Sequence, residues 1–379
     1  MKYYIIAGEP SGDLHASNLM REIQLLDPQA DFRFWGGDLM QAVGGTMVKH
    51  YRELAFMGVF AVVTNIGTIF KNIKFCKVDI KAFAPDVVIF VDYPGFNVRI
   101  SEFTKKEGIT SFYYIAPKVW AWNTGRVYNL KRNLDKIFSI LPFEVTFFKK
   151  YGVEVEYSGN PVLDAVEARL NKEESFDGFI VRNNLENKPI VAMLAGSRRE
   201  ELMRMLPDML LMAPKFPEYQ FIIAGAPSFI MDDYEPYLKN SDVKVLFGET
   251  YQLLQHSKAA MVTSGTATLE TALMNTPQVV CYRMWGGKTT DWLLHKFILK
   301  VEFVSLVNLI LDRDAVRELF QTKFTLVTLE NELNLLLNSE ERRREVFADY
   351  AELRQLMGEA GTSKITANKM VNYLNTSKK

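Results

Sequence analysis

The sequence predicts two α/β domains, each built on a doubly wound parallel sheet. The chain has 379 residues, which is more than one hydrophobic core usually holds, so we expect two domains. Short apolar runs alternate with longer segments of helical periodicity along most of this length. Several runs are apolar at every position, which is typical of parallel strands that helices cover on both faces.

The apolar runs predict ten strands, and helices between them. The expected strands are Tyr3–Ala7, Phe32–Trp35, Val87–Val91, Thr110–Tyr114, Lys136–Ile140, Ile190–Leu194, Gln220–Ala224, Lys244–Leu246, Ala259–Val262 and Gln278–Tyr282. The clearest expected helices are Leu14–Leu26, Gly125–Asn133, Glu200–Ala213 and Thr268–Met274.

The alternation of strands and helices pauses at 160–188, which is polar and rich in turn residues, and restarts at Ile190. We therefore expect an N-terminal domain over 1–163 and a C-terminal domain over 164–349. Two doubly wound domains that face each other bring the carboxyl ends of their strands to a shared central cleft, where ligands bind.

Composition excludes several classes of function. Lys and Arg total 45, as do Asp and Glu, so the formal charge is zero and no nucleic-acid partner is expected. The two cysteines and four histidines are scattered, which indicates neither a disulfide framework nor a metal site. The N-terminus MKYYIIAGEPSGD has no signal-peptide pattern, and no segment is long enough for a transmembrane helix. We expect a cytoplasmic protein that can still lie on a membrane.

One strand ends on a carboxylate. In DVVIFVDYPGFN (86–97), five apolar residues lead into Asp92, and a turn follows at once. A buried charge is costly unless another group uses it or pairs with it. Because ligands of doubly wound domains bind at the carboxyl ends of strands, we expect Asp92 to face the active cleft rather than a dry core.

The first loop, AGEPSGDLHAS (7–17), joins a strand to a helix. Gly8 and Gly12 permit tight turns, and a helix start exposes N–H groups that suit an anion. Glu9 and Asp13 would repel a phosphate, so the loop is expected to hold sugar hydroxyls. The alternative is that Ser11 or Asp13 only caps the helix.

A second loop, LAGSRREE (194–201), has the same strand–turn–helix form. Ser197 is a natural N-cap, whereas Arg198 and Arg199 are unfavourable at the positive end of a helix dipole. A bound pyrophosphate would reverse this penalty and accept bidentate bonds from a guanidinium. The alternative is a solvated pair that bonds to Glu200, Glu201 or neighbouring helices.

A third loop, VTSGTATLETAL (262–273), has the small-residue turn Ser264–Thr266 at a strand end, and Thr266 or Thr268 can cap the helix. The helix dipole alone explains Glu270 in the first turn. The alternative is that Glu270 binds the two hydroxyls of a nucleotide ribose. Together with LAGSR, this loop indicates a nucleotide-sugar site.

The stretch ELAFMGVFAVVTNIGTIFKNIKFCK (53–77) combines an apolar face at helical spacing with a basic flank. A basic amphipathic helix can lie in the interface of an anionic membrane. An ordinary core-facing helix has the same periodicity, and such helices are far more numerous. In the membrane interpretation, the contact residues are Phe56, Met57, Val59, Phe60, Val63, Ile66, Phe70, Lys71 and Lys74.

An ordered set of motifs resembles one enzyme family. The set is GEPSGDLH, ELAFMGV, PDVVIFVDYPGFN, YYIAPKVWAW, LPFE, GNPVLD, AGSR, SGTATLE, YRM and VEFVSLVNL, in this order from Lys2 to about Ala351. It is similar to the lipid-A-disaccharide synthases, glycosyltransferases of Gram-negative bacteria with the GT-B architecture. This architecture implies two Rossmann-like domains facing a central cleft, with the helices of 350–379 packed back on the first domain.

The resemblance also implies a reaction. The family joins UDP-2,3-diacylglucosamine to 2,3-diacylglucosamine 1-phosphate (lipid X), and forms the β-1,6-linked lipid A disaccharide 1-phosphate and UDP. It implies a peripheral protein on the cytoplasmic face of the inner membrane, with no cofactor and no catalytic metal. A homodimer is left open. With this resemblance, the stretch 53–77 is better interpreted as an acyl-chain and membrane contact.

The resemblance implies roles for the motif residues. Asp92 matches a position that the family treats as essential, and we interpret it as general base, or part of a relay, for the acceptor 6-hydroxyl. This hydroxyl would attack the anomeric carbon opposite the leaving UDP and invert it. Arg198 would stabilise the departing diphosphate. The residues expected to bind UDP-sugar are Ser197, Ser264, Gly265, Thr266, Thr268, Glu270, Arg283 and Asn308. The residues expected on the acceptor side are Gly8, Glu9, Ser11, Gly12 and Asp13.

Two rival interpretations remain open. A soluble GT-B enzyme, such as a UDP-N-acetylglucosamine 2-epimerase, would share the nucleotide site but would have no use for the amphipathic stretch 53–77. A non-catalytic scaffold that binds membranes would have no use for Asp92 and Arg198.

Overall fold

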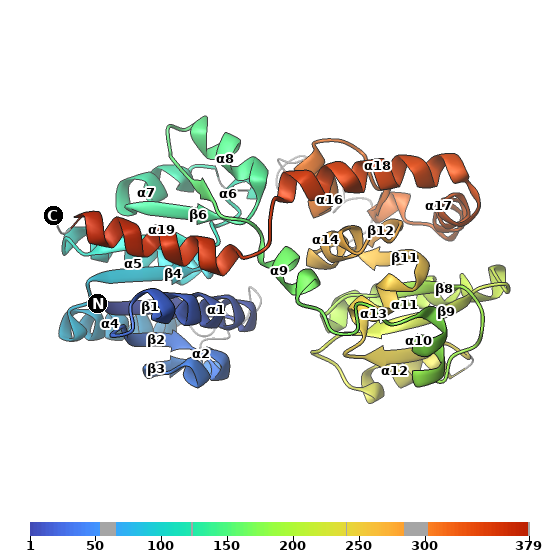
Figure 1. Ribbon diagram of the computed structural model, residues 1–379, viewed down its shortest axis with the longest axis horizontal. Coiled ribbons are helices and arrows are strands. Elements are labelled where there is room, and N and C mark those ends of the chain that lie inside the picture. The colour runs from blue at the N-terminus through green and yellow to red at the C-terminus, as the bar shows by residue number, and fades with distance from the viewer. Residues whose placement is uncertain (54–65, 123, 240, 284–301, 378–379) are drawn as a thin grey trace. The chain divides into compact units, whose positions relative to one another are not determined.

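The computed structural model describes residues 1–53, 66–122, 124–239, 241–283 and 302–377 (Figure 1). The chain forms two compact units. Unit 1 contains Met1–Pro161 and Glu359–Lys379, and unit 2 contains Val162–Gly358. The sequence put the boundary at 163/164 and the return of the chain near 350, whereas the chain returns to unit 1 only at Glu359.

Unit 1 is built on a seven-stranded sheet in which every pairing is parallel. Its strands are β1 (Lys2–Ala7), β2 (Asp31–Gly36), β3 (Thr46–His50), β4 (Val87–Val91), β5 (Thr110–Tyr114), β6 (Lys136–Ser139) and β7 (Glu156–Tyr157). They lie in the order β3-β2-β1-β4-β5-β6-β7. The chain winds one way from β1 and the other way from β4, so a topological switch point lies between these two strands.

Helices cover both faces of this sheet. They are α1 (Pro10–Leu26), α2 (Asp38–Val43), α4 (Ile66–Phe83), α5 (Pro94–Lys106), α6 (Val119–Trp122), α7 (Arg126–Asn133), α8 (Pro142–Lys149) and α19 (Thr362–Ser377). Alternate residues of β1 serve the two faces, as strand geometry requires. Tyr3 and Ile5 pack in one cluster with residues of α1 and α19, and Tyr4 and Ile6 pack in another with residues of α4, α5 and α7.

Unit 2 repeats the same plan with six parallel strands. They are β8 (Ile190–Leu194), β9 (Gln220–Gly225), β10 (Lys244–Phe247), β11 (Ser257–Thr263), β12 (Gln278–Tyr282) and β13 (Glu318–Phe320), in the order β10-β9-β8-β11-β12-β13. Its helices are α9 (Pro161–Glu167), α10 (Phe176–Arg182), α11 (Arg199–Leu210), α12 (Met231–Leu238), α13 (Thr250–Gln255), α14 (Thr266–Leu273), α16 (Leu306–Leu311), α17 (Leu326–Asn338) and α18 (Glu340–Met357). Here the switch point lies between β8 and β11.

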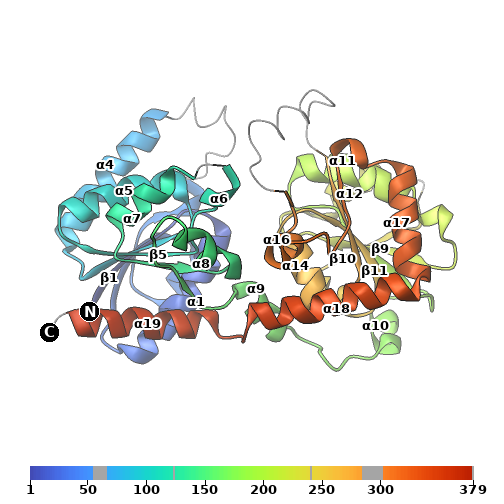
Figure 2. The same ribbon diagram turned by 90° about the horizontal axis from the view of Figure 1, so that it is seen from above.

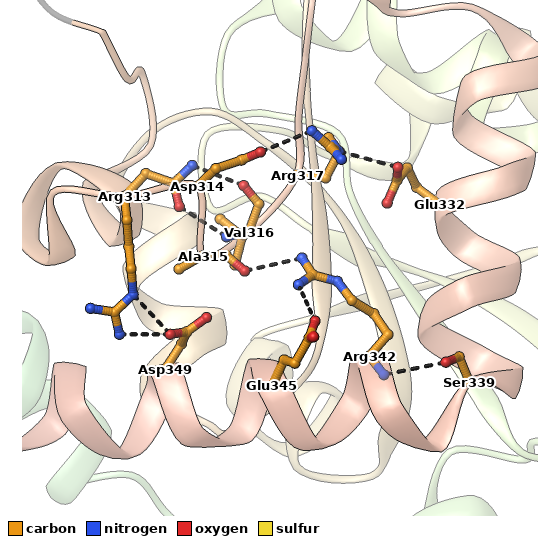
Figure 3. A network of polar contacts seen from close by, with 11 residues as sticks. Arg313, Asp314, Ala315, Val316, Arg317, Glu332, Ser339, Arg342, Glu345 and Asp349 are labelled. Carbon is orange, nitrogen blue, oxygen red and sulfur yellow. Dashed lines mark hydrogen bonds and ion pairs between the residues drawn. The ribbon is translucent and has the colours of Figure 1, made fainter.

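A polar network explains why α18 stays in unit 2 (Figure 3). Arg313, in the segment after α16, bonds to Asp349 on α18 at 2.6 Å and to Glu352 one turn further on at 2.5 Å. Arg342 of α18 bonds to the carbonyl of Ala315 at 3.1 Å. These bonds fix α18 to the segment that leads into β13. Only after Met357 does the chain turn away, and α19 then packs beside α1 in unit 1 (Figures 1 and 2).

The predicted α/β class and its parallel sheets are confirmed. Each of the ten predicted strands has a counterpart within a few residues. The three strands that the sequence did not predict, β3, β7 and β13, pair on one side only or are very short. β3 and β7 are half-exposed and β13 has only three residues, so the apolar run that identifies central strands is weak or short in them.

Candidate active site

The switch point of unit 1 brings Asp92 beside the first loop. Ala7, the last residue of β1, pairs with Val91, the last residue of β4. The loop that begins at Gly8 and the turn at Asp92 and Tyr93 therefore leave the same edge of the sheet. They also pack together, since a Cβ built on Gly8 would lie 2.3 Å from the ring of Tyr93. Only glycine fits there, so Gly8 is required by this contact.

Asp92 is half-buried, and burial raises the pKa of its carboxyl. The positive charge of Lys118 and a backbone N–H bond from Tyr93 partly offset this effect. Among the described residues, no salt bridge pairs with the charge at the end of β4, and the carboxyl lies in a partly dehydrated position. A carboxylate of this kind is a stronger base than one in water.

The residues of the first loop differ in their exposure to solvent. Ser11 is exposed and Glu9 is half-exposed, whereas Gly12 and Asp13 are buried. The negative charge of Glu9 acts on Tyr93, where it adds to the effect of burial in raising the pKa of the phenol.

Asp13 has a structural role that the sequence did not predict. Its carboxylate accepts hydrogen bonds from the backbone N–H groups of Gly37 (2.8 Å), Leu39 (3.1 Å) and Met40 (3.1 Å). These groups lie at the start of α2, so Asp13 caps that neighbouring helix. The interpretation that Ser11 or Asp13 caps α1 is wrong, because Glu9 is the N-cap of α1.

A buried carboxyl group near the same edge was missed. Glu144 is 1% exposed, and its two oxygens accept bonds from Trp120 Nε1 (2.8 Å) and from the hydroxyl of Ser139. Burial raises the pKa of Glu144 to about 7. The only signal in the sequence was its place in the motif LPFE. That Glu144 accepts a hydrogen bond from Trp120 becomes evident only when β5 and β6 lie side by side.

In unit 2 two glycine turns meet at the switch point. Leu194, at the end of β8, pairs with Val262 near the end of β11. The turns that follow contain Gly196 (φ +102°) and Gly265 (φ +151°), both in the region that favours glycine. The loops 195–198 and 264–266 therefore begin side by side, as the nucleotide-sugar prediction requires.

The loop after β8 differs from the prediction at its cap. The N-cap of α11 is Arg198 and not Ser197. The carboxylate of Glu201, in the first turn, accepts bonds from the N–H groups of Ser197 (3.0 Å) and Arg198 (3.3 Å). In this state Glu201 occupies the amides that a phosphate would use.

The two arginines of this loop behave differently. The side chain of Arg198 is 74% exposed and approaches Glu201 at 3.4 Å. Arg199 is 84% exposed and pairs with Asp233 on α12 at 2.9 Å. Each has one acidic partner, as the solvated-pair alternative expects, but these contacts are weak at such exposure. Both guanidinium groups remain accessible to an anion.

The helix that follows the third loop, α14, begins without a side-chain cap. Gly265 is the N-cap of α14, so the interpretation that Thr266 or Thr268 caps this helix is wrong. Thr268 is fully buried and donates to the carbonyl of Gly265 at 2.8 Å. Ser264 donates to the carbonyl of Val304 at 3.1 Å, and Thr266 is exposed.

Glu270 is held by a neighbour that the sequence did not predict. Tyr251, on α13, donates to its carboxylate at 2.9 Å. Burial raises the pKa of Glu270, and this hydrogen bond partly offsets the effect. The expectation that Glu270 lies in the first turn of its helix is wrong, because α14 begins at Thr266 and has no acidic residue in its first turn, so the helix dipole does not explain Glu270. The arrangement instead suits a carboxylate aimed at hydroxyl groups.

Arg283 and Asn308 are bonded within unit 2. Arg283 pairs with Asp208 (2.9 Å), donates to the carbonyl of Phe324 (2.8 Å) and lies over the ring of that residue. The amide of fully buried Asn308 bonds in both directions to the backbone of Val316. Asn308 thus joins α16 to the segment that leads into β13.

The amphipathic stretch is described only from Ile66 onward. Phe56, Met57, Val59, Phe60 and Val63 lie outside the described residues. In α4 the inner face is buried and includes Ile73, Cys76 and Ile80, while Phe70, Phe75 and Val78 are exposed. Lys71 and Lys74 are also exposed. A helix that only covered the core would not need three large apolar residues on its outer face.

A buried ionic contact attaches α4 to the sheet. Asp79 accepts two bonds from Arg33 of β2, at 2.9 and 2.5 Å, and one from the hydroxyl of Tyr4 at 2.7 Å. The inner face of α4 is therefore fixed in register, and its outer face is presented outward. No helix among the described residues is long and apolar enough to cross a membrane. In the same part of the chain no cluster of three His, Cys, Asp or Glu residues could hold a metal ion.

The chain is similar over nearly its whole length to one family. The family model described as lipid-A-disaccharide synthetase matches residues 3–370. The lipid-A-disaccharide synthase of Geobacter metallireducens is 33% identical over 376 residues, covering 98% of this chain and 96% of that protein. The lipid-A-disaccharide synthase of Myxococcus xanthus is 34% identical over 377 residues, covering 98% of this chain and 97% of that protein.

Solved structures of other enzymes share the fold. The UDP-GlcNAc 2-epimerase of Neisseria meningitidis, bound to UDP-GlcNAc, matches with a TM-score of 0.68 and 14% identity, covering 98% of this chain and all of that one. The glycotransferase of kitacinnamycin matches with a TM-score of 0.62 and 11% identity, covering 98% and 99% of the two chains. At such identities the likeness shows only the fold, two Rossmann-like domains, in agreement with the GT-B prediction. The family match is what identifies the protein: the chain belongs to the lipid-A-disaccharide synthetases, glycosyltransferases of lipid A biosynthesis.

Proposed function

We propose that this protein transfers 2,3-diacylglucosamine from UDP to the 6-hydroxyl of lipid X, with inversion at the anomeric carbon. The observation that carries the proposal is Asp92, a half-buried carboxyl with a raised pKa at the switch point of unit 1. The C6 oxygen forms the new glycosidic bond, the bond from the anomeric carbon to the diphosphate breaks, and the proton of the hydroxyl passes to Asp92. The reaction therefore transfers the diacylglucosamine group and releases UDP, and it changes no other group.

Asp92 acts as general base in this scheme. A carboxylate within about 3 Å of the hydroxyl supplies roughly 10²–10⁴ in rate. Its raised pKa increases its basicity, and the positive charge of Lys118 partly offsets the rise. Glu9 and Ser11, the outward residues of the first loop, are assigned to the hydroxyl groups of the acceptor. Gly8, Gly12 and Asp13 support them by shaping the loop.

The leaving diphosphate is assigned to the two glycine turns of unit 2. The N–H groups of Ser197 and Arg198 would exchange the carboxylate of Glu201 for a phosphate oxygen. The exposed guanidinium of Arg198 would then neutralise charge that develops on the leaving group. The turn at Ser264, Gly265 and Thr266 adds the amides at the start of α14.

The remaining nucleotide contacts follow from Glu270. Its carboxylate, oriented by Tyr251, accepts hydrogen bonds from the ribose hydroxyls. Thr268 and Asn308 are buried and bonded, so we assign them to the support of this site. Arg283 is bonded in the same way, but it is partly exposed and can still reach an anion on its open side.

Membrane contact is assigned to the outer face of α4. Phe70, with Phe75 and Val78, would enter the headgroup layer while Lys71 and Lys74 meet anionic lipid. A helix fixed to the sheet through Asp79 can bring diacylated substrates to unit 1 without spanning the bilayer. The protein is thus proposed to lie on the cytoplasmic face of the inner membrane.

The test uses purified protein in detergent with UDP-2,3-diacylglucosamine and lipid X. UDP release and disaccharide mass are followed together, and a parallel arm contains UDP-N-acetylglucosamine alone. We expect disaccharide only when both lipid substrates are present. Epimerised sugar in the parallel arm would favour the 2-epimerase instead. Absence of turnover in both arms, with vesicle binding retained, would leave a non-catalytic scaffold.

A further inference from the structure

The backbone at Asp92 is held in an unusual conformation. Asp92 (φ +45°) and Tyr93 (φ +48°) are consecutive non-glycine residues in the left-handed region. Each such residue costs energy, and the cost is higher for the bulky Tyr93 than for an aspartate. A conformation of this kind persists only where the surroundings impose it, and it is often found at functional sites.

Two buried side chains impose it from different elements. The carbonyl of Asp92 accepts a hydrogen bond from the hydroxyl of Tyr113 on β5 (2.5 Å) and from Nδ2 of Asn97 on α5 (2.8 Å). Both Tyr113 and Asn97 are 0% exposed. On its other side, the N–H of Asp92 donates to the carbonyl of Tyr114 at 3.1 Å. The peptide groups on both sides of the Asp92 Cα are therefore fixed.

Asn97 also joins the strands that form the switch point. The same Nδ2 lies 3.3 Å from the carbonyl of Ile6 and 3.4 Å from that of Val91. Its backbone N–H donates to the carbonyl of Tyr93 at 3.1 Å. One amide group thus holds the ends of β1 and β4 and the turn between β4 and α5.

We infer that Asn97 and Tyr113 are positioning residues, which fix the left-handed turn at Asp92 and thereby aim its carboxylate. The direction of a short side chain follows from its backbone, because Asp has only χ1 and χ2 with which to compensate. A displacement of about 1 Å at a reacting group can cost roughly 10² in rate. The bonds of both side chains go to the backbone carbonyl of Asp92, so they hold the carboxylate through its backbone. The inference rests on the proposed role of Asp92 as general base.

The contrary view is that the two bonds only start α5 and stabilise the unit. A matched pair of variants separates the two views. Tyr113→Phe removes one buried hydroxyl next to Asp92. Tyr3→Phe removes a hydroxyl from another fully buried tyrosine of the same sheet, one that donates to Asp27 at 3.1 Å. Tyr3 pairs with Val87, at the opposite end of β4 from Asp92.

The experiment measures kcat, both KM values and the melting temperature of the full-length protein. For Tyr113→Phe we expect kcat to fall about 10- to 100-fold while both KM values stay within about twofold, because only the geometry of the base changes. Tyr3→Phe should show a comparable shift in melting temperature with kcat unchanged. A Tyr113→Phe enzyme as active as Tyr3→Phe would overturn the inference.

A second variant and a second readout keep the test decisive. Asn97→Ala removes the other bond, and its loss of kcat should combine with that of Tyr113→Phe less than multiplicatively, because both act on one carbonyl. Amide hydrogen exchange should be faster at 92–97 in each variant and unchanged elsewhere in the sheet.

Failure of the inference and failure of the proposed function give different results. If the wild type forms disaccharide and Tyr113→Phe matches it, the inference fails and the function stands. If the wild type forms none, the proposed function fails, and hydrogen exchange decides whether the turn is held as inferred. Unchanged exchange at 92–97 in both variants would overturn the inference in either case.

Discussion

The two switch points have the same topology and opposite chemistry. In unit 1 the end of β4 and the first turn of α8 carry half-buried and buried acids, Asp92 and Glu144, whose pKa values are raised by burial. In unit 2 the strand ends carry glycine turns and the exposed Arg198, and the carboxylate of Glu201 accepts bonds from the amides of the first turn. A dehydrated carboxylate suits proton abstraction, and glycine turns beside a cation suit a diphosphate. Under the proposed function, one fold used twice divides chemistry and nucleotide binding between its two copies.

The largest effect should come from Asp92→Asn. Loss of the base should lower kcat by about 10²–10⁴. The melting temperature at pH 7.5 should stay the same or rise, because the raised pKa means that the ionised carboxylate is disfavoured in the folded state. Steady-state kinetics and thermal unfolding measure both. Loss of folding instead would mean that the carboxylate is structural.

Arg198→Ala should have the next largest effect. Removal of one donor to developing negative charge costs about 10²–10³ in kcat. The side chain is 74% exposed, so the melting temperature should not change. Arg199→Ala is the matched control, because Arg199 is adjacent, equally basic and 84% exposed. Equal losses in both variants would show that the loop uses only its summed charge.

Glu144 should make unit 1 sensitive to pH. Its carboxyl keeps its proton up to about pH 7 in the folded state, against an ordinary pKa of 4.5. The stability from this difference is complete below pH 4.5 and is lost as pH rises through about 7. The free energy of unfolding should therefore fall by up to about 1.4 kcal/mol per pH unit in this range.

Glu144→Gln tests this pH dependence, because glutamine fills the same space and cannot ionise. Urea unfolding at pH 5, 6 and 7 should give a flatter profile for Glu144→Gln than for wild type. Glu235→Gln, at an exposed glutamate on α12, is the control and should keep the wild-type slope. A wild-type slope in Glu144→Gln would show that this carboxyl is already ionised in the folded protein.

The smallest effect concerns membrane binding. A lysine near an anionic surface contributes about 1 kcal/mol, so Lys71→Gln with Lys74→Gln should weaken binding to anionic vesicles about 30-fold. Lys149→Gln with Lys150→Gln removes the same charge at the end of α8 and should have little effect. Flotation with vesicles of mixed phosphatidylglycerol and phosphatidylethanolamine measures this. Equal losses in both double variants would remove α4 as the contact surface.

The sequence predicted the central strands well because they are buried on both faces. The five consecutive apolar residues of β4 are typical of a parallel strand that is covered on both faces. β3 and β13 lie at sheet edges, and β7 has two residues, so their apolar pattern is too weak. Three N-cap interpretations failed, because α1, α11 and α14 begin with Glu9, Arg198 and Gly265 as N-caps.

The site residues that the sequence predicted could be recognised from their neighbours along the chain. The partners that it missed are neighbours only in the folded structure. Glycines after strands and Asp92 at a strand end are visible in the sequence itself. The orienting partners are not, because Tyr251 lies 19 residues before Glu270, and Tyr113 lies 21 residues after Asp92. Such pairings arise only once parallel strands and their helices are side by side. Motif spacing cannot supply them.

The affinity for UDP, measured by calorimetry in wild type and Asp92→Asn, tests the division of labour most directly. If chemistry belongs to unit 1 and the nucleotide to unit 2, Asp92→Asn should bind UDP within about twofold of wild type while its kcat falls by about 10²–10⁴. A loss of UDP affinity greater than about tenfold in this variant would contradict the division, because Asp92 would then belong to the nucleotide site.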